Sequence, residues 1–480
     1  MVRSSTDVVD ARVSLREEMA GGDLGDDRLN ARRDRLIDVL ERSPSTGFPD
    51  VCASDGDVEA LYRFLRNRRV SLATVLEPHL QATGARCQAL GTVLVIHDTT
   101  EMSFTGEQVR KGLTALGARR QGFWVHAALA VSADGLRAPL GVLSLAPFSR
   151  QPPSGPKRPW RERYQDPAKE SRRWAAGVAA VRARVGAADR AIHVMDREGD
   201  NYERFAALTA QGDRFVVRLH YDRRLVPEGT ADIPRRLSDG RPTEGLVERE
   251  VTVAPRRTSD RPHLLAYPLR DGRVATVRFA ARRVTLQRPR DHRASLLPAA
   301  ITAHVVYCWE ASPPPGEVPV EWSLVTTEPI DTVAQVLQIV EWYRTRWLIE
   351  EFFKCLKTGC AYEKRQLESL NTLLVALALL APIAWQLLLL RHLARALSDT
   401  PARVALTGRQ LQVLRATPAG APLPSQPTTR DALRAVARLG GHLRQNGEPG
   451  WLVLGRGMQK LLRLEAGWAT AEQARGCDQS

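Results

Sequence analysis

Apolar and polar residues change their spacing along this chain, and the changes predict its elements. Residues 1–75 place apolar side chains at helical spacing. Beyond residue 75, short apolar and β-branched runs alternate with helical segments, in the order β-β-β-α-β-α. Residues 372–480 return to a helical pattern, which a stretch rich in Pro, Ala and Gly interrupts at 417–428. The pattern therefore predicts an α/β protein of several domains, with helical regions at both ends.

The individual elements follow from the same spacing. Near the N-terminus, one helix buries Leu29, Leu36, Ile37 and Leu40, and an Asp55-capped helix buries Leu61, Phe64 and Leu65. The central strands and helices are expected at Val93–His97, Val125–Val131, Arg137–Leu143, Pro167–Val185, Ala191–Met195 and Asn201–Leu208. Residues 221–320 are strand-like, dense in arginine and punctuated by Pro and Gly, which predicts a long β-rich insertion.

One helical stretch carries an unusual set of polar residues. Tyr343, Arg346, Glu350 and Lys357 are separated by 3, 4 and 7 residues within an uninterrupted helix predicted from Asp331 to Lys357. At about 100° per residue these side chains share one narrow face. A carboxylate flanked by a phenol, a guanidinium and an ammonium suits a site that holds a metal and grips phosphates. The alternative is a solvated helix face with ordinary ion pairs.

Two further carboxylates follow buried strands. The run before Asp98 and the run before Asp196 both read as strands, and open α/β sheets place their sites at such strand ends. Each aspartate taken alone is equally a turn residue or a helix cap. Together with Glu350 they form an oxygen-only ligand set that suits Mg²⁺ or Mn²⁺. Paired divalent ions serve phosphodiester chemistry, so the sequence favours a nuclease-like reaction.

The amino-acid composition indicates which class of partner the protein binds. The chain of 480 residues carries 69 Lys and Arg against 54 Asp and Glu, a net charge of +15, so its field attracts a polyanion. Eleven arginines fall within Pro255–Arg293. A general compositional preference for arginine is the alternative explanation. The apolar run Leu373–Leu390 contains Pro382, and we expect it to form a buried core or interface helix, with a membrane span as the alternative.

Cysteine usage and the N-terminus suggest the compartment. The six cysteines form no CxxC pair and lack companion histidines at zinc spacing. They indicate reduced thiols in a cytoplasmic protein. The N-terminus is polar and acidic, unlike a signal peptide. His97 and His126 lie near the first aspartate, and we expect buried histidines at both positions, with metal ligation as the alternative.

The signature residues carry a family resemblance. The segment YRTRWLIEEFFKCLK, from Tyr343 to Lys357, is similar to the Tyr-Arg-Glu-Lys signature of bacterial cut-and-paste DDE transposases of the insertion-sequence-four type. HDTT around Asp98 and DREGDNYE around Asp196 resemble the two aspartate motifs of that family. Further segments resemble its hairpin-forming members in the same order along nearly the whole chain: GDLGDDRLNARR, LYRFLRN, GFWVHAALA, RFVVRL, EWSLVTTEPI and PGWLVLGRGMQKL.

The resemblance implies a domain plan. It gives a helical domain that binds transposon ends at 1–75 and a ribonuclease-H-like core at 76–220. A β-rich insertion with DNA contacts occupies 221–320, and the second part of the core, with the glutamate helix, occupies 321–371. A helical dimerisation domain follows at 372–480.

The resemblance also implies roles for single residues. Asp98, Asp196 and Glu350 are expected to be catalytic and to hold two Mg²⁺ ions, which Mn²⁺ could replace. Trp322 is expected to stack a flipped-out base, although a core tryptophan is the default expectation at such a position. The expected DNA contacts are Tyr343, Arg346, Lys354, Lys357, Trp322, Arg218, Trp347 and Arg63.

The implied reaction is transposition. One type of displacement would nick the transposon end, form a hairpin, open it and join the 3′-hydroxyl to target DNA. The implied partners are the inverted-repeat ends, target DNA and a second copy of the chain in a synaptic complex, with no membrane. Two alternatives are a metal-dependent nuclease that joins no strands and a catalytically inactive DNA-binding regulator.

Overall fold

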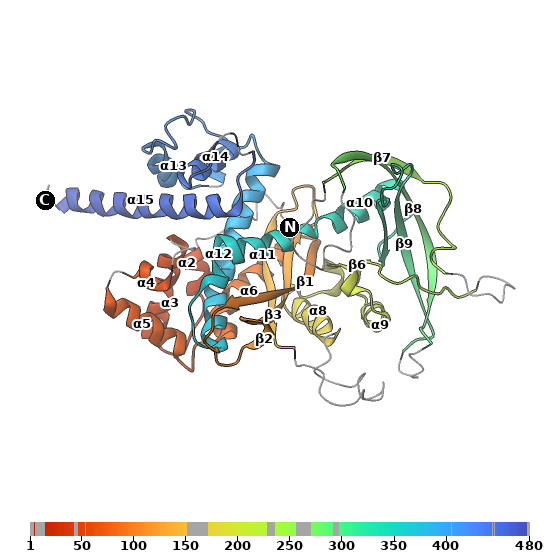
Figure 1. The fold of residues 1–480 in the computed structure, drawn as a ribbon, viewed down its shortest axis with the longest axis horizontal. Helices are drawn as coiled ribbons and strands as arrows, with labels where there is room; N and C mark the ends of the chain where they lie inside the picture. Colours follow the sequence, from red (N-terminus) through yellow and green to blue (C-terminus); the bar gives the residue numbers. More distant parts are fainter. Residues whose placement is uncertain are drawn as a thin grey trace. The chain divides into compact units, whose positions relative to one another are not determined.

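The chain divides into two compact units. The computed structural model describes residues 4, 15–42, 47–52, 54–150, 171–227, 236–255, 270–290, 297–404, 406–443, 445 and 447–477. The first unit comprises residues 1–93, 98–186 and 347–480, and the second comprises residues 94–97 and 187–346. Figure 1 shows the helices and strands of both units.

Short helices fill the N-terminal part of the first unit. They are α2 (Leu15–Ala20), α3 (Asp27–Arg42), α4 (Phe48–Val51), α5 (Asp55–Arg66) and α6 (Leu72–Ala89). The predicted apolar faces are largely confirmed: Leu36, Ile37 and Leu40 of α3 and Leu61, Phe64 and Leu65 of α5 are buried, whereas Leu29 of α3 is only half-buried. The predicted cap of α5 was wrong by one residue: the Ser54 side chain accepts the hydrogen bond from the Asp57 N–H.

The strands of the first unit are longer than the sequence predicted. They are β1 (Val93–Thr105), β2 (Thr114–Gly117), β3 (Arg120–Ser132) and β4 (Pro139–Phe148), and α8 (Ser171–Val185) follows. Residues 167–170 of the predicted helix lie outside the described residues. The expected end of β1 was wrong, because the strand continues beyond Asp98 as the neighbour of β3. A Cβ on Gly122 would lie 1.9 Å from the Met102 carbonyl oxygen, which shows how closely the two strands approach.

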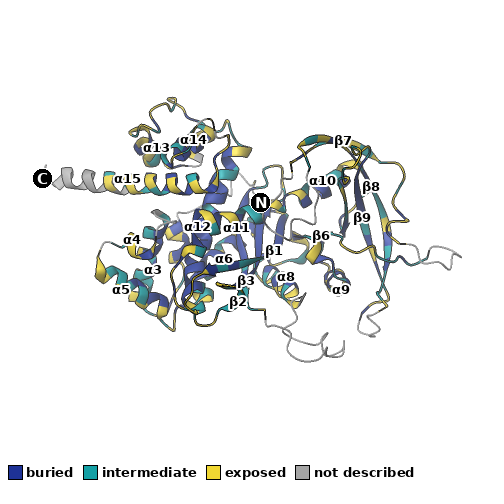
Figure 2. Ribbon diagram, in the orientation of Figure 1, coloured by how far each residue is buried: buried dark blue, intermediate teal, exposed yellow. Residues whose placement is uncertain are grey.

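The C-terminal part of the first unit is helical, as predicted. It contains α12 (Leu370–Ala396), α13 (Gly408–Arg415), α14 (Thr429–Leu439) and α15 (Trp451–Cys477), and the predicted break at 417–428 separates α13 from α14. Within the described residues, α12 is the one helix long and apolar enough to span a membrane. However, 89% of its most apolar window is buried inside the structure, which agrees with the predicted core helix. Figure 2 shows this burial along α12.

The second unit is built on a sheet. Leu94–His97 of β1 lies beside β5 (Ala191–Met195), and then come β6 (Arg214–Arg218), β10 (Glu321–Thr326), β9 (Ala300–Glu310), β8 (Arg273–Gln287) and β7 (Val247–Val253). Strands β5 and β6 are parallel, whereas β6 to β7 along this order pair antiparallel. The described part of 221–320 is thus rich in strands. Within the arginine-dense stretch 255–293, residues 256–269 and 291–293 lie outside the described residues.

Two helices of the second unit lie on opposite faces of this sheet. On one face, Phe205 of α9 (Tyr202–Ala210) stacks on Phe215 at a centroid distance of 5.7 Å. Leu324 pairs with Arg218, so Trp322, Leu324 and Arg218 share the other face. Tyr343 of α10 (Val333–Arg344) contacts the Trp322 ring there. The two helices therefore sandwich the centre of the sheet.

The predicted single helix from Asp331 to Lys357 was wrong. Helix α10 ends at Arg344, α11 covers Trp347–Lys354, and a wider π-helical turn covers Cys355–Gly359. The Thr345 hydroxyl donates to the Glu341 carbonyl at 2.9 Å, and the Arg346 N–H bonds to Tyr343 O, three residues back. Such local bonding tightens the backbone and ends the regular repeat.

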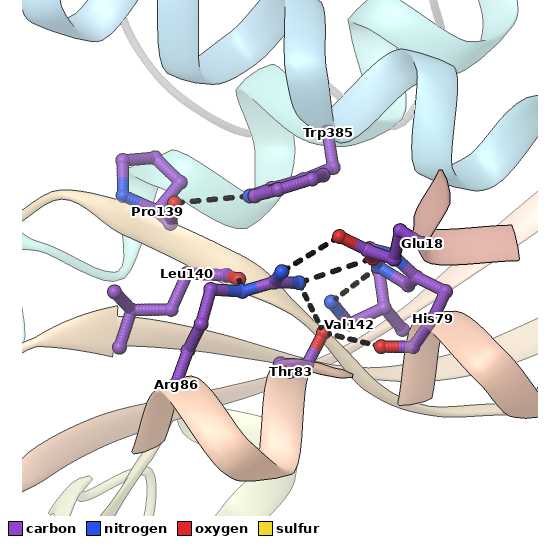
Figure 3. Close-up of polar contacts among 8 residues, drawn as sticks. All are labelled: Glu18, His79, Thr83, Arg86, Pro139, Leu140, Val142 and Trp385. Carbon is purple, nitrogen blue, oxygen red and sulfur yellow. Dashed lines mark hydrogen bonds and ion pairs between the residues drawn. The ribbon is translucent and has the colours of Figure 1, made fainter. Parts of the chain in front are cut away.

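A buried polar network joins the N-terminal helices to the rest of the first unit (Figure 3). Glu18 of α2 accepts from Arg86 at 2.7 Å and lies 2.5 Å from Nδ1 of His79, and both partners belong to α6. The Val142 N–H of β4 donates to His79 Nε2, and Arg86 donates to the Leu140 carbonyl. Trp385 of α12 lies 4.5 Å from the Arg86 guanidinium, so four elements meet at one ion pair.

The cysteines agree with the expectation of reduced thiols. Cys52, Cys87, Cys308, Cys355 and Cys360 are free, and all except Cys52 are buried. Burial raises the pKa of the Cys87 thiol to about 12, so that thiol stays protonated at neutral pH.

Candidate active site

The first aspartate lies in β1, not at its end. Asp98 is half-buried, and its Oδ1 accepts a hydrogen bond from the Thr99 N–H at 2.7 Å. The neighbouring histidines are buried: His97 Nε2 lies 2.9 Å from His193 Nδ1, and His126 Nδ1 lies 3.0 Å from the Thr99 hydroxyl. The expectation of buried histidines at His97 and His126 is confirmed.

The second aspartate directly follows β5, as predicted. Asp196 is half-buried and caps a short turn at Arg197–Gly199, where its Oδ1 accepts from the Glu198 N–H at 2.9 Å. The turn needs glycine, because a Cβ at Gly199 would lie 2.5 Å from Met195 Cβ. Below the turn, burial lowers the pKa of Arg204 to about 10, although Asp196 opposes this shift. Arg204 therefore stays cationic at neutral pH beneath the Asp196 turn.

The glutamate and the lysine of the signature are both half-buried. Glu350 lies in the first turn of α11. The Lys357 ammonium, in the π-helical turn, donates to the Glu101 carbonyl at 2.6 Å and lies 3.7 Å from the Glu363 carboxylate. Tyr343 is buried and Arg346 is half-buried, so none of the four signature residues is fully exposed.

The exposed side of α11 carries two other predicted DNA contacts. Trp347 is 51% exposed, and the Lys354 ammonium lies 4.9 Å from the centroid of its ring. Lys354 also lies 3.5 Å from Glu351. It thus groups with Trp347 on α11. Arg63 of α5 is exposed and lies 2.5 Å from Glu59, an i,i+4 ion pair.

Three predicted DNA contacts gather on one face of the second unit. The Trp322 and Tyr343 rings lie 5.5 Å apart at an interplanar angle of 46°. Trp322 is half-buried, so part of its ring remains accessible. Arg218 shares this face, and its Nε is buried without a hydrogen-bond partner among the described residues. The sheet therefore brings together an aromatic pair and a guanidinium that are far apart in the sequence.

The three candidate metal ligands share one donor chemistry. Asp98, Asp196 and Glu350 offer half-buried carboxylates, and oxygen donors of this kind suit Mg²⁺ or Mn²⁺. Within the part of the chain that the structure describes, no three His, Cys, Asp or Glu side chains are grouped to hold a metal ion. The ligand role of the three carboxylates thus stays a prediction.

The sequence reasoning missed a buried ion pair beside Asp196. The Asp200 side chain is fully buried and bonds to the guanidinium of Arg223. The motif DREGDN could have pointed to this ion pair, because a second aspartate follows Asp196 by four residues. Its partner lies in a loop beyond β6, so only the fold could identify it.

Comparison with known proteins identifies two parts of the chain. Residues 12–70 match the family model described as transposase DNA-binding. Residues 171–385 match the model described as transposase DDE domain, a stretch that includes Asp196 and Glu350 and begins after Asp98. One solved structure is a piggyBac transposase synaptic complex with hairpin DNA, at 9% identity and a TM-score of 0.34. The match covers 82% of this chain and 75% of that one, and similarity at this level establishes no shared fold.

Proposed function

We propose that this protein, which carries a transposase DNA-binding domain followed by a transposase DDE domain, excises a DNA element and joins its ends to a new site. The observation that carries the proposal is the order of the two matched domains along one chain. The net charge of +15 supports a polyanionic substrate. A DDE domain also implies dependence on a divalent metal ion.

In this proposal Asp98, Asp196 and Glu350 are the catalytic carboxylates and hold two Mg²⁺ ions, which Mn²⁺ can replace. Bound divalent ions would activate the attacking oxygen and stabilise the leaving oxygen of each phosphodiester displacement. The Thr99 and Glu198 N–H groups orient Asp98 and Asp196, because each donates to one carboxylate oxygen. Arg204 fixes the turn that Asp196 caps by donating to the Gly199 carbonyl.

The cationic and aromatic residues have a separate role. Arg346, Lys357 and Arg218 grip phosphates near the cleaved bond, and such contacts position DNA without choosing its sequence. Trp322, supported by Tyr343, stacks a displaced base while a strand is bent into a hairpin. Trp347 and Lys354 provide an exposed aromatic and cationic contact on α11, and Arg63 provides a phosphate contact on α5.

The finer architecture belongs to the same proposal. A ribonuclease-H-like core, formed by 76–220 and 321–371, carries the chemistry. The helices of residues 1–75 recognise the element ends, and the strands of 221–320 add DNA contacts. Helices of 372–480 join two protomers in a synaptic complex, where each active site cuts DNA that the other protomer holds.

Removing a single carboxylate should abolish cleavage and spare end binding. Asp98→Ala, Asp196→Ala and Glu350→Ala each remove one ligand. The test substrate is the DNA that flanks the coding sequence, where the proposal expects inverted repeats, incubated with Mg²⁺. Undiminished cleavage by any of the three variants would remove that residue from the site. Cleavage without joining of the 3′ ends would instead indicate a nuclease.

Trp322→Ala should impair hairpin formation more than first-strand nicking. The lost stacking is worth about 1–3 kcal/mol per base, or roughly a 5- to 150-fold loss of the hairpin step. Trp322→Phe keeps an aromatic ring and serves as the matched control. Denaturing gels that resolve nicked and hairpin products give the measurement. An equal loss of both products would argue against a stacking role.

A further inference from the structure

The loop after β6 is held rigidly beside Asp196. Asp200 Oδ2 accepts from the N–H groups of His220 and Tyr221 at 2.7 Å and 2.8 Å, and its Oδ1 bonds to Arg223. The Asp200 side chain is fully buried, and that of Arg223 is 8% exposed. A buried ion pair with every oxygen satisfied resists opening, because either charge left alone would be costly. The backbone of residues 220–221 is therefore fixed.

The same contacts tie this loop to the turn of Asp196. Asp196 and Asp200 begin and end the turn at Arg197–Gly199. Strands β5 and β6 run parallel with Met195 opposite Val217, so the chain leaves both strands at the same edge of the sheet. The turn of Asp196 and the Tyr221 loop thus form one assembly within the second unit.

The fixed loop presents an aromatic ring to solvent. Tyr221 is 60% exposed. The His220 ring lies edge-on against it at 4.7 Å, and the Arg223 guanidinium lies 5.7 Å from its centroid. Burial usually stabilises an aromatic side chain. The backbone hydrogen bonds nevertheless hold the loop of Tyr221 in place, with the ring exposed. A pre-ordered ring flanked by an imidazole and a guanidinium can stack a base with little loss of conformational entropy.

We propose that Tyr221 is a stacking platform for an unpaired nucleobase next to the bond that is cut at Asp196. The inference rests on the proposed function, since it takes DNA as the substrate. Stacking on an aromatic face tolerates any base and requires that the base be unpaired. Tyr221 is thus a substrate-positioning residue, and Asp200 acts through it by holding the loop.

The test compares two DNA probes in the full-length protein. One is a blunt duplex, and the other is the same duplex with a single-stranded 3′ extension that contains 2-aminopurine. The wild type is expected to bind the extended probe more tightly and to quench its fluorescence. Tyr221→Ala should weaken binding of the extended probe by about 10-fold and abolish quenching, with blunt-duplex affinity unchanged.

Two further substitutions at Tyr221, and one elsewhere, test whether the aromatic ring itself is responsible. Tyr221→Phe should behave as the wild type, and Tyr221→Leu should behave as Tyr221→Ala, because an aliphatic side chain offers no flat face. Leu246→Ala removes another exposed apolar side chain of the second unit and should change neither probe.

The outcomes separate the two proposals. Wild-type protein that cleaves element ends, together with unchanged quenching by Tyr221→Ala, would overturn the platform and leave the proposed function standing. Equal weakening of both probes by Tyr221→Ala would also overturn it, because it would show a general contact. Wild-type protein that binds neither probe and cuts no DNA would overturn the proposed function itself.

Discussion

At the scale of single residues, the protonation of His79 follows from its hydrogen bonds. The Val142 N–H donates to Nε2, so that nitrogen carries a lone pair and the imidazole is neutral. The proton resides on Nδ1 and is donated to Glu18. Burial lowers the pKa of His79, which agrees with the neutral form. The charges in the network are then those of Glu18 and Arg86, and they cancel.

Glu18→Ala should lower the free energy of unfolding by about 3–5 kcal/mol, because it leaves the Arg86 guanidinium buried beside a neutral histidine. Chemical denaturation of the variant and the wild type measures the difference. The matched control is Glu59→Ala, which breaks an exposed ion pair with Arg63 and should cost less than about 1 kcal/mol. A similar loss in both variants would contradict a special role for the network.

Glu18 and His79 also make the stability of the fold depend on pH. Burial opposes ionisation of Glu18, but His79 and Arg86 lower its pKa from 4.5 to about 2. Its contribution to stability is therefore complete above pH 4.5 and is lost as the pH falls toward 2. The lowered pKa of His79 acts in the same direction below pH 6.5, because the unfolded imidazole takes up a proton first. Urea unfolding across this range should show stability falling as pH falls, and a rise would contradict both shifts.

At the scale of elements, glycine sets how closely α14 and α15 approach. A Cβ on Gly457 of α15 would lie 1.8 Å from the Val436 carbonyl oxygen of α14. A Cβ on Gly440, at the end of α14, would lie 1.9 Å from the Val453 carbonyl oxygen. Both obstacles are backbone atoms, so a substitution must move a helix and not just a side chain.

Gly457→Ala should destabilise the protein by about 1–3 kcal/mol or more, because the helices are forced apart. Gly467→Ala, in the same helix with nothing within 4 Å, is the matched control. It should be neutral or stabilising by up to about 1 kcal/mol, since alanine favours helix more than glycine. Thermal unfolding of both variants provides the measurement, and equal effects would refute the close-packing argument.

At the scale of the whole molecule, the net charge of +15 should make DNA binding depend strongly on salt. Six to ten phosphate contacts correspond to a loss of about 10³- to 10⁵-fold in affinity between roughly 50 and 200 mM salt. Lys354→Ala should reduce the slope of log affinity against log salt by about one, if this exposed ammonium contacts a phosphate. Fluorescence anisotropy with a labelled duplex measures the slope, and an unchanged slope would exclude that contact.

The sequence by itself determined the elements whose information is local. The buried faces of α3 and α5, strand β5 before Asp196 and the core helix α12 followed from apolar spacing, because burial of a stripe requires that spacing. The motifs likewise singled out Glu350 and the two aspartates as candidates. These predictions needed no knowledge of which segments lie next to each other.

Tertiary structure decided what depends on distant partners. Strand β1 continues past Asp98 because β3 lies beside it, and Lys357 bonds to the Glu101 carbonyl, 256 residues away in the chain. Tyr221 is fixed by Asp200, and Glu18 meets His79 from 61 residues away. The four signature residues were predicted to share one face of a single helix, but they lie in separate segments with different neighbours. A hydrogen bond between residues far apart in the chain leaves no periodic trace in the sequence, so only the folded chain could reveal these contacts.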